Sequence, residues 1–374
     1  MLALVGRGLE LPAARESTNH TPTRAQTGSR EALCRELAEV FGLQEWPVAP
    51  LSGHGRLRRA NLRPVYERSD MLLTNLLLTN LRSEPMIYLI SGATGNIGSL
   101  VVKRLLDRGE RPRVLVRDAE KARSRYGDRV DVLVGDFADA TTMTAALTGV
   151  DAFLLVSSID DLAARDEVAA KAAKAAKVKH LVKISSIAVP QKNIGTGVWH
   201  AQGEAAIRAS GVPFTFVQPS GFMENCLWWA SSIKSEGVVR SSAGEGKSPV
   251  IHSDDIAAVA TKALTTQEYI GESLRVTGPE LLSYPEMVAK IGARIGKPLR
   301  FEALSDEEER RQLLARNRPK PMVEALISVF RAMREGRLAK VTDTVERVLG
   351  RKPISFDRWL EQYAAAFRVA KSEN

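Results

Sequence analysis

Short apolar runs alternate with amphipathic segments from residue 86 to about residue 217. The apolar runs are typical of buried strands, which we expect at 86–90, 113–116, 130–134, 153–156, 180–185 and 214–217. Helices are expected between them, at 96–108, 119–126, 141–147, 162–177 and 201–209. Near-continuous apolar strands separated by helices are typical of parallel sheets covered on both faces. The pattern therefore predicts an α/β fold with a doubly wound parallel sheet.

Beyond about residue 235 the regular alternation gives way to mixed elements and several charged helices. Two of these helices begin with a capping box, in which a serine precedes a glutamate by three residues: Ser283 with Glu286, and Ser305 with Glu308. We therefore expect residues 86–238 to form one domain around the parallel sheet, and residues 239–374 a smaller C-terminal α/β lobe.

Three glycines at a spacing of three residues follow the first predicted strand, in the sequence GATGNIGS at 92–99. Between a strand and an amphipathic helix, such glycines are typical of a dinucleotide site, since they permit a tight turn and close backbone approach. The start of the helix directs its amides and its dipole toward the phosphates. We therefore expect residues 86–238 to be a Rossmann-type NAD(P)-binding domain, and the lobe at 239–374 to close over a substrate. The cofactor is expected to be held by Gly92, Thr94, Gly95, Asn96, Ile97 and Gly98. The alternative is a tight β–α turn without a ligand.

The end of the second predicted strand bears on the choice between NADP(H) and NAD(H). Arg117 stands where a guanidinium can hold a 2′-phosphate, and Lys121, one turn further on, adds a second positive charge. In the alternative, Arg117 faces solvent and Asp118 binds the adenosine ribose, as an acid does in many NAD sites. We favour NADP(H).

The ends of the next two strands supply further cofactor candidates, because ligands of doubly wound sheets bind at the carboxyl ends of the strands. Asp136 and Phe137 end the third strand and are expected beside the adenine. Ser157 and Ser158 end the fourth strand and are expected near the nicotinamide ribose.

The composition is that of a globular protein, with 44% hydrophobic and 26% charged residues among 374. No apolar run approaches the roughly 20 residues that span a bilayer. The net charge is +9, but the basic residues are interleaved with acids, so we expect no nucleic-acid partner.

The two cysteines, Cys34 and Cys226, have no metal-ligand spacing, which favours a reduced, cytoplasmic compartment. We also expect no metal at His252, because Ser253 or Asp254 there suits a helix cap better.

Residues 1–85 differ from the rest, with eleven arginines, no lysine and only short apolar patches. They lack the pattern of a signal peptide. We expect this segment to be poorly ordered or non-essential, and the working protein to begin at Met86. The alternative is a small regulatory or partner-binding segment.

Several stretches of the sequence resemble the atypical short-chain dehydrogenases, and more narrowly the NmrA-like family. They are GATGNIGS, VRDAEKA, GDFAD at 135–139, SGVPFTFVQPSGFMEN at 210–225, SPVIHSDDIAAVA and RKPISFDRWLEQYAAAF. The resemblance covers roughly residues 86–370 and implies a Rossmann fold with a nicotinamide cofactor, with Pro219 among the residues beside it. The family includes NAD(P)H-dependent reductases and catalytically silent proteins that sense cofactor ratios. Gln218 stands where many relatives carry arginine, so the contacts of that loop stay open.

The usual short-chain dehydrogenase acid, a tyrosine followed four residues later by lysine, is absent from the sequence. His200 and Glu204 instead lie four residues apart, on one face of a predicted helix. The resemblance places His200 where other members hold a lysine near the nicotinamide. In one interpretation His200 is a histidinium that donates a proton, while Glu204 orients it and raises its pKa. In the other it only caps or hydrogen-bonds within the cleft. Ser185 or Ser186 is expected to hydrogen-bond the substrate oxygen.

Aromatic residues follow the sixth predicted strand, where a substrate loop is expected. Phe222, Met223, Trp228 and Trp229 suit either a flat apolar pocket or a core, and we favour the pocket. The sequence therefore predicts an NAD(P)H-dependent oxidoreductase that reduces a carbonyl or quinone of a hydrophobic aromatic molecule, with specialised metabolism as a suggested setting. The alternative is a non-catalytic sensor of the NAD(P)(H) ratio that acts through a protein partner. The oligomeric state stays open.

Overall fold

The fold is described from a computed structural model of the chain, which places residues 86–136, 138–157, 161–191 and 193–369. The predictions made for residues 1–85, Phe137 and Ser158 lie outside these described residues. Within the described ranges, none of the helices combines the length and apolar character that a membrane crossing requires.

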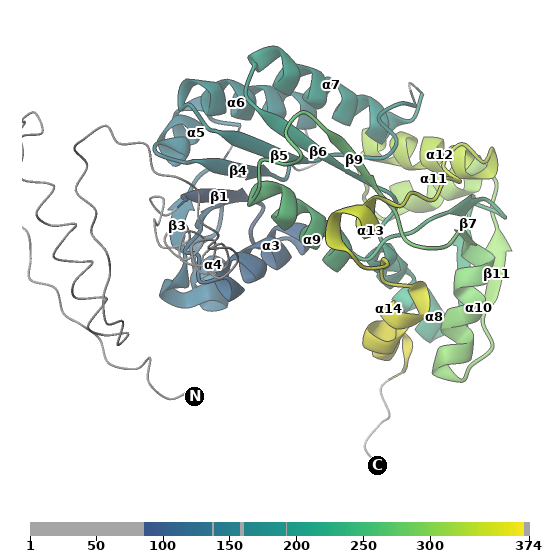
Figure 1. Cartoon of the computed structure of the whole chain (residues 1–374). Helices are drawn as coiled ribbons and strands as arrows, with labels where there is room; N and C mark the ends of the chain where they lie inside the picture. The colour runs from purple at the N-terminus through teal and green to yellow at the C-terminus, as the bar shows by residue number, and fades with distance from the viewer. Residues whose placement is uncertain (1–85, 137, 158–160, 192, 370–374) are drawn as a thin grey trace, which may run out of the picture. The chain divides into compact units, whose positions relative to one another are not determined.

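A seven-stranded parallel sheet lies at the centre of the described chain (Figure 1). Its strands are β1 (Tyr88–Ser91), β2 (Arg113–Val116), β3 (Asp131–Val134), β4 (Ala152–Leu155), β5 (His180–Ile184), β6 (Phe214–Pro219) and β9 (Ser273–Val276). They are ordered β3-β2-β1-β4-β5-β6-β9, and every neighbouring pair is parallel. The strand order reverses between β1 and β4, which is where doubly wound sheets bind their ligands. The predicted Rossmann-type sheet is confirmed.

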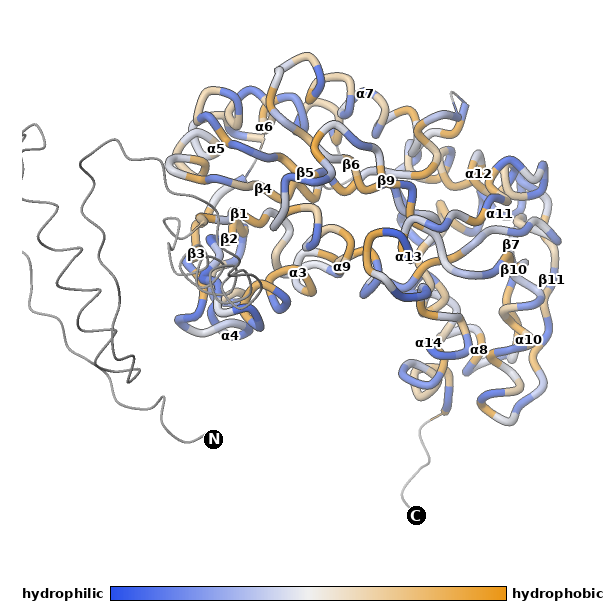
Figure 2. Tube along the Cα trace, viewed as in Figure 1, coloured by the Kyte–Doolittle hydropathy of each residue, from blue (hydrophilic) through white to orange (hydrophobic). Residues whose placement is uncertain are grey.

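Helices cover both faces of this sheet (Figure 1). One face carries α5 (Ala140–Leu147), α6 (Leu162–Ala175) and α7 (Gly195–Ser210), and the other carries α3 (Asn96–Asp107), α9 (Ser253–Leu264) and α13 (Thr344–Leu349). Helix α4 (Ala119–Tyr126) packs beside β3. Successive strand residues point to opposite faces, so Leu89 joins the core under α5–α7 and Ile90 the core under α3 and α9. Figure 2 shows the strands as predominantly hydrophobic segments between these helices.

Helix α7 begins at Gly195, earlier than the predicted start at residue 201. Its first turns contain two glycines, which the sequence pattern assigned to a loop because glycine disfavours helices. Packing overrides that preference, since a Cβ at Gly195 would lie 2.9 Å from the Cα of Ala325, and one at Gly197 would lie 2.3 Å from the carbonyl oxygen of Ala188. The glycines therefore let α7 pack closely against its neighbours, and His200 lies inside the helix rather than before it.

The sheet is not contained in the range 86–238 that the sequence assigned to it. Strand β9 pairs with β6, and α9 packs against α3, although both β9 and α9 come later in the chain. The described residues belong to one compact unit. A division into two domains near residue 238 therefore stays a prediction.

The remaining elements form a smaller lobe beside the sheet (Figure 1). It consists of η2 (Met223–Trp229), α8 (Ala230–Glu236), β7 (Val238–Ser241), β8 (Lys247–Ser248), β10 (Leu282–Ser283), α10 (Tyr284–Ile295), β11 (Arg300–Ala303), α11 (Asp306–Ala315), α12 (Lys320–Arg334), α14 (Phe356–Tyr363) and η3 (Ala364–Phe367). Its core centres on Trp359, whose ring stacks on Phe356 at 5.2 Å and on Tyr363 at 5.0 Å. The two predicted capping boxes, at the starts of α10 and α11, are confirmed.

Candidate active site

The glycine turn after β1 has the geometry of a dinucleotide cradle. Gly92 has a φ of 61°, a left-handed conformation that favours glycine, and its carbonyl accepts a hydrogen bond from the Gly95 amide at 2.9 Å. A Cβ at Gly98 would lie 2.3 Å from that same carbonyl oxygen, so a larger residue would force α3 away from the turn. Gly95 and Asn96 are exposed at the start of α3. These residues fit a bound pyrophosphate, which the helix N-terminus favours electrostatically.

Contacts from other elements hold the cradle in place. The Tyr126 hydroxyl of α4 donates to the Ala93 carbonyl at 2.5 Å, and Arg125 donates to the Thr94 carbonyl at 3.4 Å. The side chain of Ile97 is buried in the core, which leaves only its backbone for a ligand. Asn96 is already engaged through its amide nitrogen, which donates to the Ser253 hydroxyl at 2.9 Å.

The start of α9 meets the cradle through this contact with Ser253. His252 is the N-cap of α9, since its Nδ1 accepts a hydrogen bond from the Asp254 amide at 3.0 Å. The prediction of Ser253 or Asp254 as the cap was wrong, because the observed cap lies one residue before Ser253. The Ser253 amide instead binds the carboxylate of Glu224, which lies in η2 and had no distinguishing signal in the sequence.

The positive charges at the end of β2 are available to a ligand. Arg117 and Lys121 are both exposed, and neither forms an ion pair with any residue that the structure describes. Asp118, the acid of the alternative interpretation, caps α4 and accepts the Lys121 amide at 3.0 Å.

Asp136, which follows β3, accepts the Ala138 amide at 2.9 Å and pairs with Arg165 at 2.5 Å. The Ala138 hydrogen bond and the nearby arginine charge lower the pKa of Asp136.

A fully buried ion pair lies behind the ends of β4 and β5. The Lys183 ammonium of β5 is 2.5 Å from a carboxylate oxygen of Asp166 in α6, and both side chains have no exposed surface. Ser157, which was expected near the nicotinamide ribose, donates its hydroxyl to the other carboxylate oxygen of Asp166. A Cβ at Gly203 of α7 would lie 2.0 Å from Asp166, so glycine there makes room for the pair. The sequence did not reveal this pair, because Lys183 lies within an apolar strand and Asp166 in an alanine-rich helix.

Glu204 is also fully buried, but it does not bind His200. Its carboxylate accepts the Ser185 hydroxyl at 2.6 Å, the Gln218 amide at 2.7 Å and the Arg208 guanidinium at 3.2 Å. The prediction that Glu204 orients His200 was therefore wrong, since its carboxylate faces β5 and β6 instead. Ser185 is buried with its hydroxyl committed to Glu204, which removes it as a donor to a substrate.

His200 is a neutral imidazole in this environment. Burial, together with the positive charge of Lys183, lowers its pKa to about 3. Its Nδ1 is buried without a hydrogen-bond partner among the described residues. The predicted histidinium with a raised pKa was therefore wrong, because Glu204 is engaged elsewhere and Lys183 disfavours a second positive charge. Ser186 is half-buried, and its hydroxyl oxygen accepts the Ala188 amide at 3.2 Å.

A pocket opens between the carboxyl ends of β5 and β6 and the smaller lobe. At the sheet it is lined by Ile187, Ser220 and Gly221. The Ile187 amide donates to the carbonyl of buried Pro219 at 2.9 Å, which joins the two strand ends. On the lobe side aromatic residues line the pocket: Phe222, Trp228, Trp229, Tyr284 and Phe330. Three of the four predicted substrate residues are among them.

Met223 is the exception, and its assignment to the pocket was wrong. Its side chain is fully buried in the core of the lobe. Because a 3-10 helix repeats every three residues, Met223 shares the inner side of η2 with buried Cys226.

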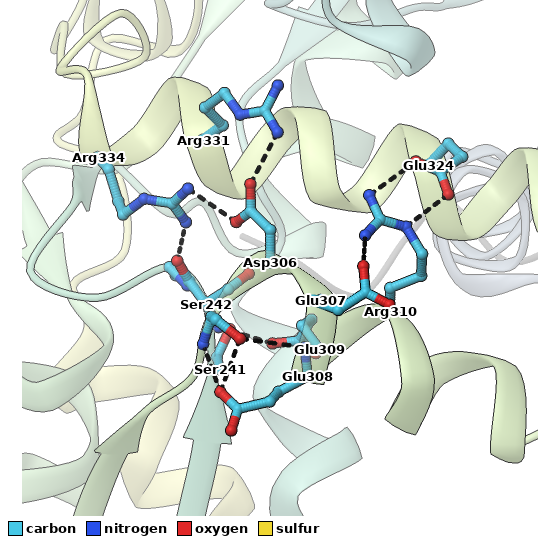
Figure 3. Close-up of polar contacts among 12 residues, drawn as sticks. Ser241, Ser242, Asp306, Glu307, Glu308, Glu309, Arg310, Glu324, Arg331 and Arg334 are labelled. Carbon is cyan, nitrogen blue, oxygen red and sulfur yellow. Dashed lines mark hydrogen bonds and ion pairs between the residues drawn. The ribbon is translucent and has the colours of Figure 1, made fainter.

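The far wall of the pocket is held by a polar cluster at the start of α11 (Figure 3). Glu309 lines the pocket and accepts the Ser242 amide at 2.7 Å, while burial raises the pKa of its carboxyl. Asp306 pairs with Arg331 and with Arg334 of α12, each at 2.8 Å. These contacts fix α11 and α12 against the end of β7.

Comparisons with known proteins agree with this geometry. The profile of a family described as NAD(P)H-binding matches residues 92–267. The (4-alkanoyl-5-oxo-2,5-dihydrofuran-3-yl)methyl phosphate reductase of Streptomyces griseus is 40% identical over 283 residues, which are 75% of this chain and 99% of that protein. The chain belongs to the NmrA-like family of atypical short-chain dehydrogenases/reductases. Because relatives such as this one are reductases rather than sensors, the chain is an NAD(P)H-dependent oxidoreductase.

A further relative supports the assignment, and a solved structure supports the fold. The NAD(P)H azoreductase of Xenophilus azovorans is 37% identical over 287 residues, which are 76% of this chain and 100% of that protein. The fold matches the NADPH complex of the quinone oxidoreductase from Escherichia coli with a TM-score of 0.69 and 24% identity. That match covers 74% of this chain and 99% of the other.

Proposed function

We propose that this oxidoreductase reduces a carbonyl or quinone group of a hydrophobic aromatic molecule. The observation that carries the proposal is the pocket lined by Phe222, Trp229 and Tyr284, which begins at the carboxyl ends of β5 and β6. Ligands of doubly wound sheets bind at that edge, so a substrate in the pocket would lie beside a nicotinamide held from the cradle. The names of the relatives, which include an azoreductase and a quinone oxidoreductase, support a flat unsaturated substrate.

We propose NADPH rather than NADH as the preferred cofactor. Arg117 and Lys121 lie at the end of β2 and in the first turn of α4, exposed to a ligand, and neither forms an ion pair with the described residues. A 2′-phosphate would provide that partner. Asp118 is engaged in capping α4, which weakens the alternative of an acid that binds the ribose. When bound, the reduced nicotinamide supplies the hydride.

The residues around the reacting carbon would bind and orient the substrate rather than donate a full proton. We propose that Ser186 and the neutral imidazole of His200 donate hydrogen bonds to the substrate oxygen as negative charge develops on it. A histidine with a pKa of about 3 carries no extra proton at neutral pH, so the proton that completes the reduction would come from water. Asp166, Lys183 and Glu204 would fix the inner wall of this site through their buried contacts.

We keep the cytoplasm as the expected compartment. Cys226 is a free thiol buried in the lobe, as a reduced environment allows.

The test is NADPH oxidation by the full-length protein against 1,4-naphthoquinone, an aromatic ketone and an azo compound. We expect turnover with at least the quinone, and a loss of about tenfold in kcat for His200→Ala. His200→Gln should retain most of the activity, because its amide still donates a hydrogen bond. Undiminished turnover in His200→Ala would remove the residue from the mechanism. Tight NADPH binding without reduction of any compound would refute the proposed substrate class.

A further inference from the structure

The outer end of the substrate pocket carries an arginine, Arg316, that forms no ion pair with the residues that the structure describes. Glu309, Leu313 and Arg316 all line the pocket and are spaced i, i+4 and i+7, so they form one stripe along α11 and its C-cap. At 1.5 Å per residue, Glu309 and Arg316 are separated by about 10 Å along the helix axis. Glu309 is buried at the inner end, whereas Arg316 is exposed at the outer end.

The two arginines that line the pocket differ in their partners. Arg240 is paired on both sides, with Glu236 at 2.7 Å and with Glu302 at 2.7 Å. Arg316 makes no hydrogen bond or ion pair through its guanidinium with any part of the chain that the structure describes. Its charge acts on the Glu309 carboxyl without direct contact, so the N–H groups of its guanidinium can still bind an anionic group that enters the pocket.

A second cation and an exposed aromatic ring lie at the same end. Trp228 lines the pocket, and its side chain is 57% exposed, which is unusual for a tryptophan. The guanidinium of Arg318 lies over this ring, 5.5 Å from its centroid. The outer end of the pocket thus combines a flat apolar surface with two positively charged side chains.

We propose that the pocket takes substrates that carry an anionic substituent, which Arg316 binds while the aromatic body lies against Trp228 and Trp229. The substituent is a carboxylate, sulfonate or phosphate, since each presents oxygens that a guanidinium can bind in the same way. Glu309 is buried at the inner end, where burying a second charged group would be costly, so the substrate enters with its neutral, reducible end first. The proposal rests on the proposed function for the location of the reaction, but the binding that it describes needs no turnover.

The test compares two ligands of the same shape and different charge, naphthalene-2-sulfonate and the neutral naphthalene-2-sulfonamide. Their binding to the full-length protein is measured by isothermal titration calorimetry in saturating NADP⁺, where no reduction takes place. We expect the wild type to bind the sulfonate about tenfold more tightly, as a charge-assisted hydrogen bond allows. In Arg316→Gln this ratio should fall to about one, with the affinity for the sulfonamide unchanged.

Arg311→Gln is the matched control, because Arg311 is an exposed arginine of the same helix and does not line the pocket. It removes the same charge from α11 and should keep the tenfold ratio. Equal affinities for both ligands in the wild type, a ratio that survives Arg316→Gln, or no binding of either ligand would each overturn the proposal. Because no step of this assay requires hydride transfer, it can succeed even if no quinone is reduced, and it can fail while quinones are reduced.

Discussion

The buried pair of Lys183 and Asp166 provides the most quantitative test of the structure. Both side chains have no exposed surface, and their charged atoms lie 2.5 Å apart. Lys183→Met would leave the Asp166 carboxylate buried with only the Ser157 hydroxyl as a donor. It would also remove a positive charge near the buried Glu204, which would keep its contact with Arg208. Removing one partner of such a pair costs about 3–5 kcal/mol, because the other charge stays buried and unpaired.

The double variant Lys183→Met/Asp166→Leu separates this cost from a simple loss of packing. It replaces both charges by apolar groups of similar volume, which is often close to neutral for stability. Only the Ser157 hydroxyl then lacks its acceptor, at a cost of about 1–3 kcal/mol. We therefore expect the double variant to be more stable than Lys183→Met alone.

Urea unfolding followed by circular dichroism measures both effects. With a slope of about 2 kcal/mol per molar urea, Lys183→Met should lower the midpoint by about 1.5–2.5 M. The double variant should recover about half of that loss. An unchanged midpoint in Lys183→Met, or a double variant as unstable as the sum of the two single variants, would refute the reasoning.

Three further predictions concern the cofactor site and His200. Arg117→Ala should weaken NADPH binding about tenfold and leave NADH binding unchanged, as measured by fluorescence titration. The control is Arg123→Ala, which removes an arginine that pairs with an acid of the same helix and should change the affinity for neither cofactor. Gly98→Ala should abolish cofactor binding, since the added Cβ would lie 2.3 Å from a backbone oxygen. Gly109→Ala is the control: its Cβ would meet nothing within 4 Å, so this variant should bind the cofactor normally despite the strained φ at that position. The pKa of His200 is about 3 in the folded protein and near 6.5 in the unfolded chain, so between these pH values only the unfolded state gains a proton. The free energy of unfolding should therefore fall as the pH drops below about 6.5. His200→Gln should weaken that dependence in unfolding curves measured from pH 7 to pH 4.

The strands of the sheet were largely predictable, because each buried parallel strand is a short apolar run with a helix on either side. Strand β2 was predicted with its observed bounds, and helix α4 as well. Strand β9 was missed, since SLRV alternates buried and exposed residues and lies far from the other strands in the sequence. The early start of α7 was missed because its glycines serve tertiary packing, which local propensity does not reveal.

The site was predictable where backbone conformation alone fixes the role of a residue. The glycine turn met this condition, because its close contacts require glycine whatever the surroundings are. The partners of Glu204 did not, since they come from β5, β6 and α7 and depend on the packing of all three. The pKa of His200 depended in turn on Lys183, a residue that the sequence pattern marked only as part of a strand.

The central claim is that substrates react in the pocket at the carboxyl ends of β5 and β6. Gly221 offers the most direct test, because it lines this pocket and an added Cβ would meet only Val250, at an ordinary contact distance of 3.9 Å. A leucine there should fill the part of the pocket next to the sheet without disturbing the fold. The measurement is steady-state NADPH oxidation with 1,4-naphthoquinone, alongside NADPH affinity, for the wild type and Gly221→Leu. We predict that the variant binds NADPH as tightly as the wild type but loses at least tenfold in kcat/KM for the quinone. Unchanged kcat/KM in Gly221→Leu would contradict the account and place the reaction elsewhere.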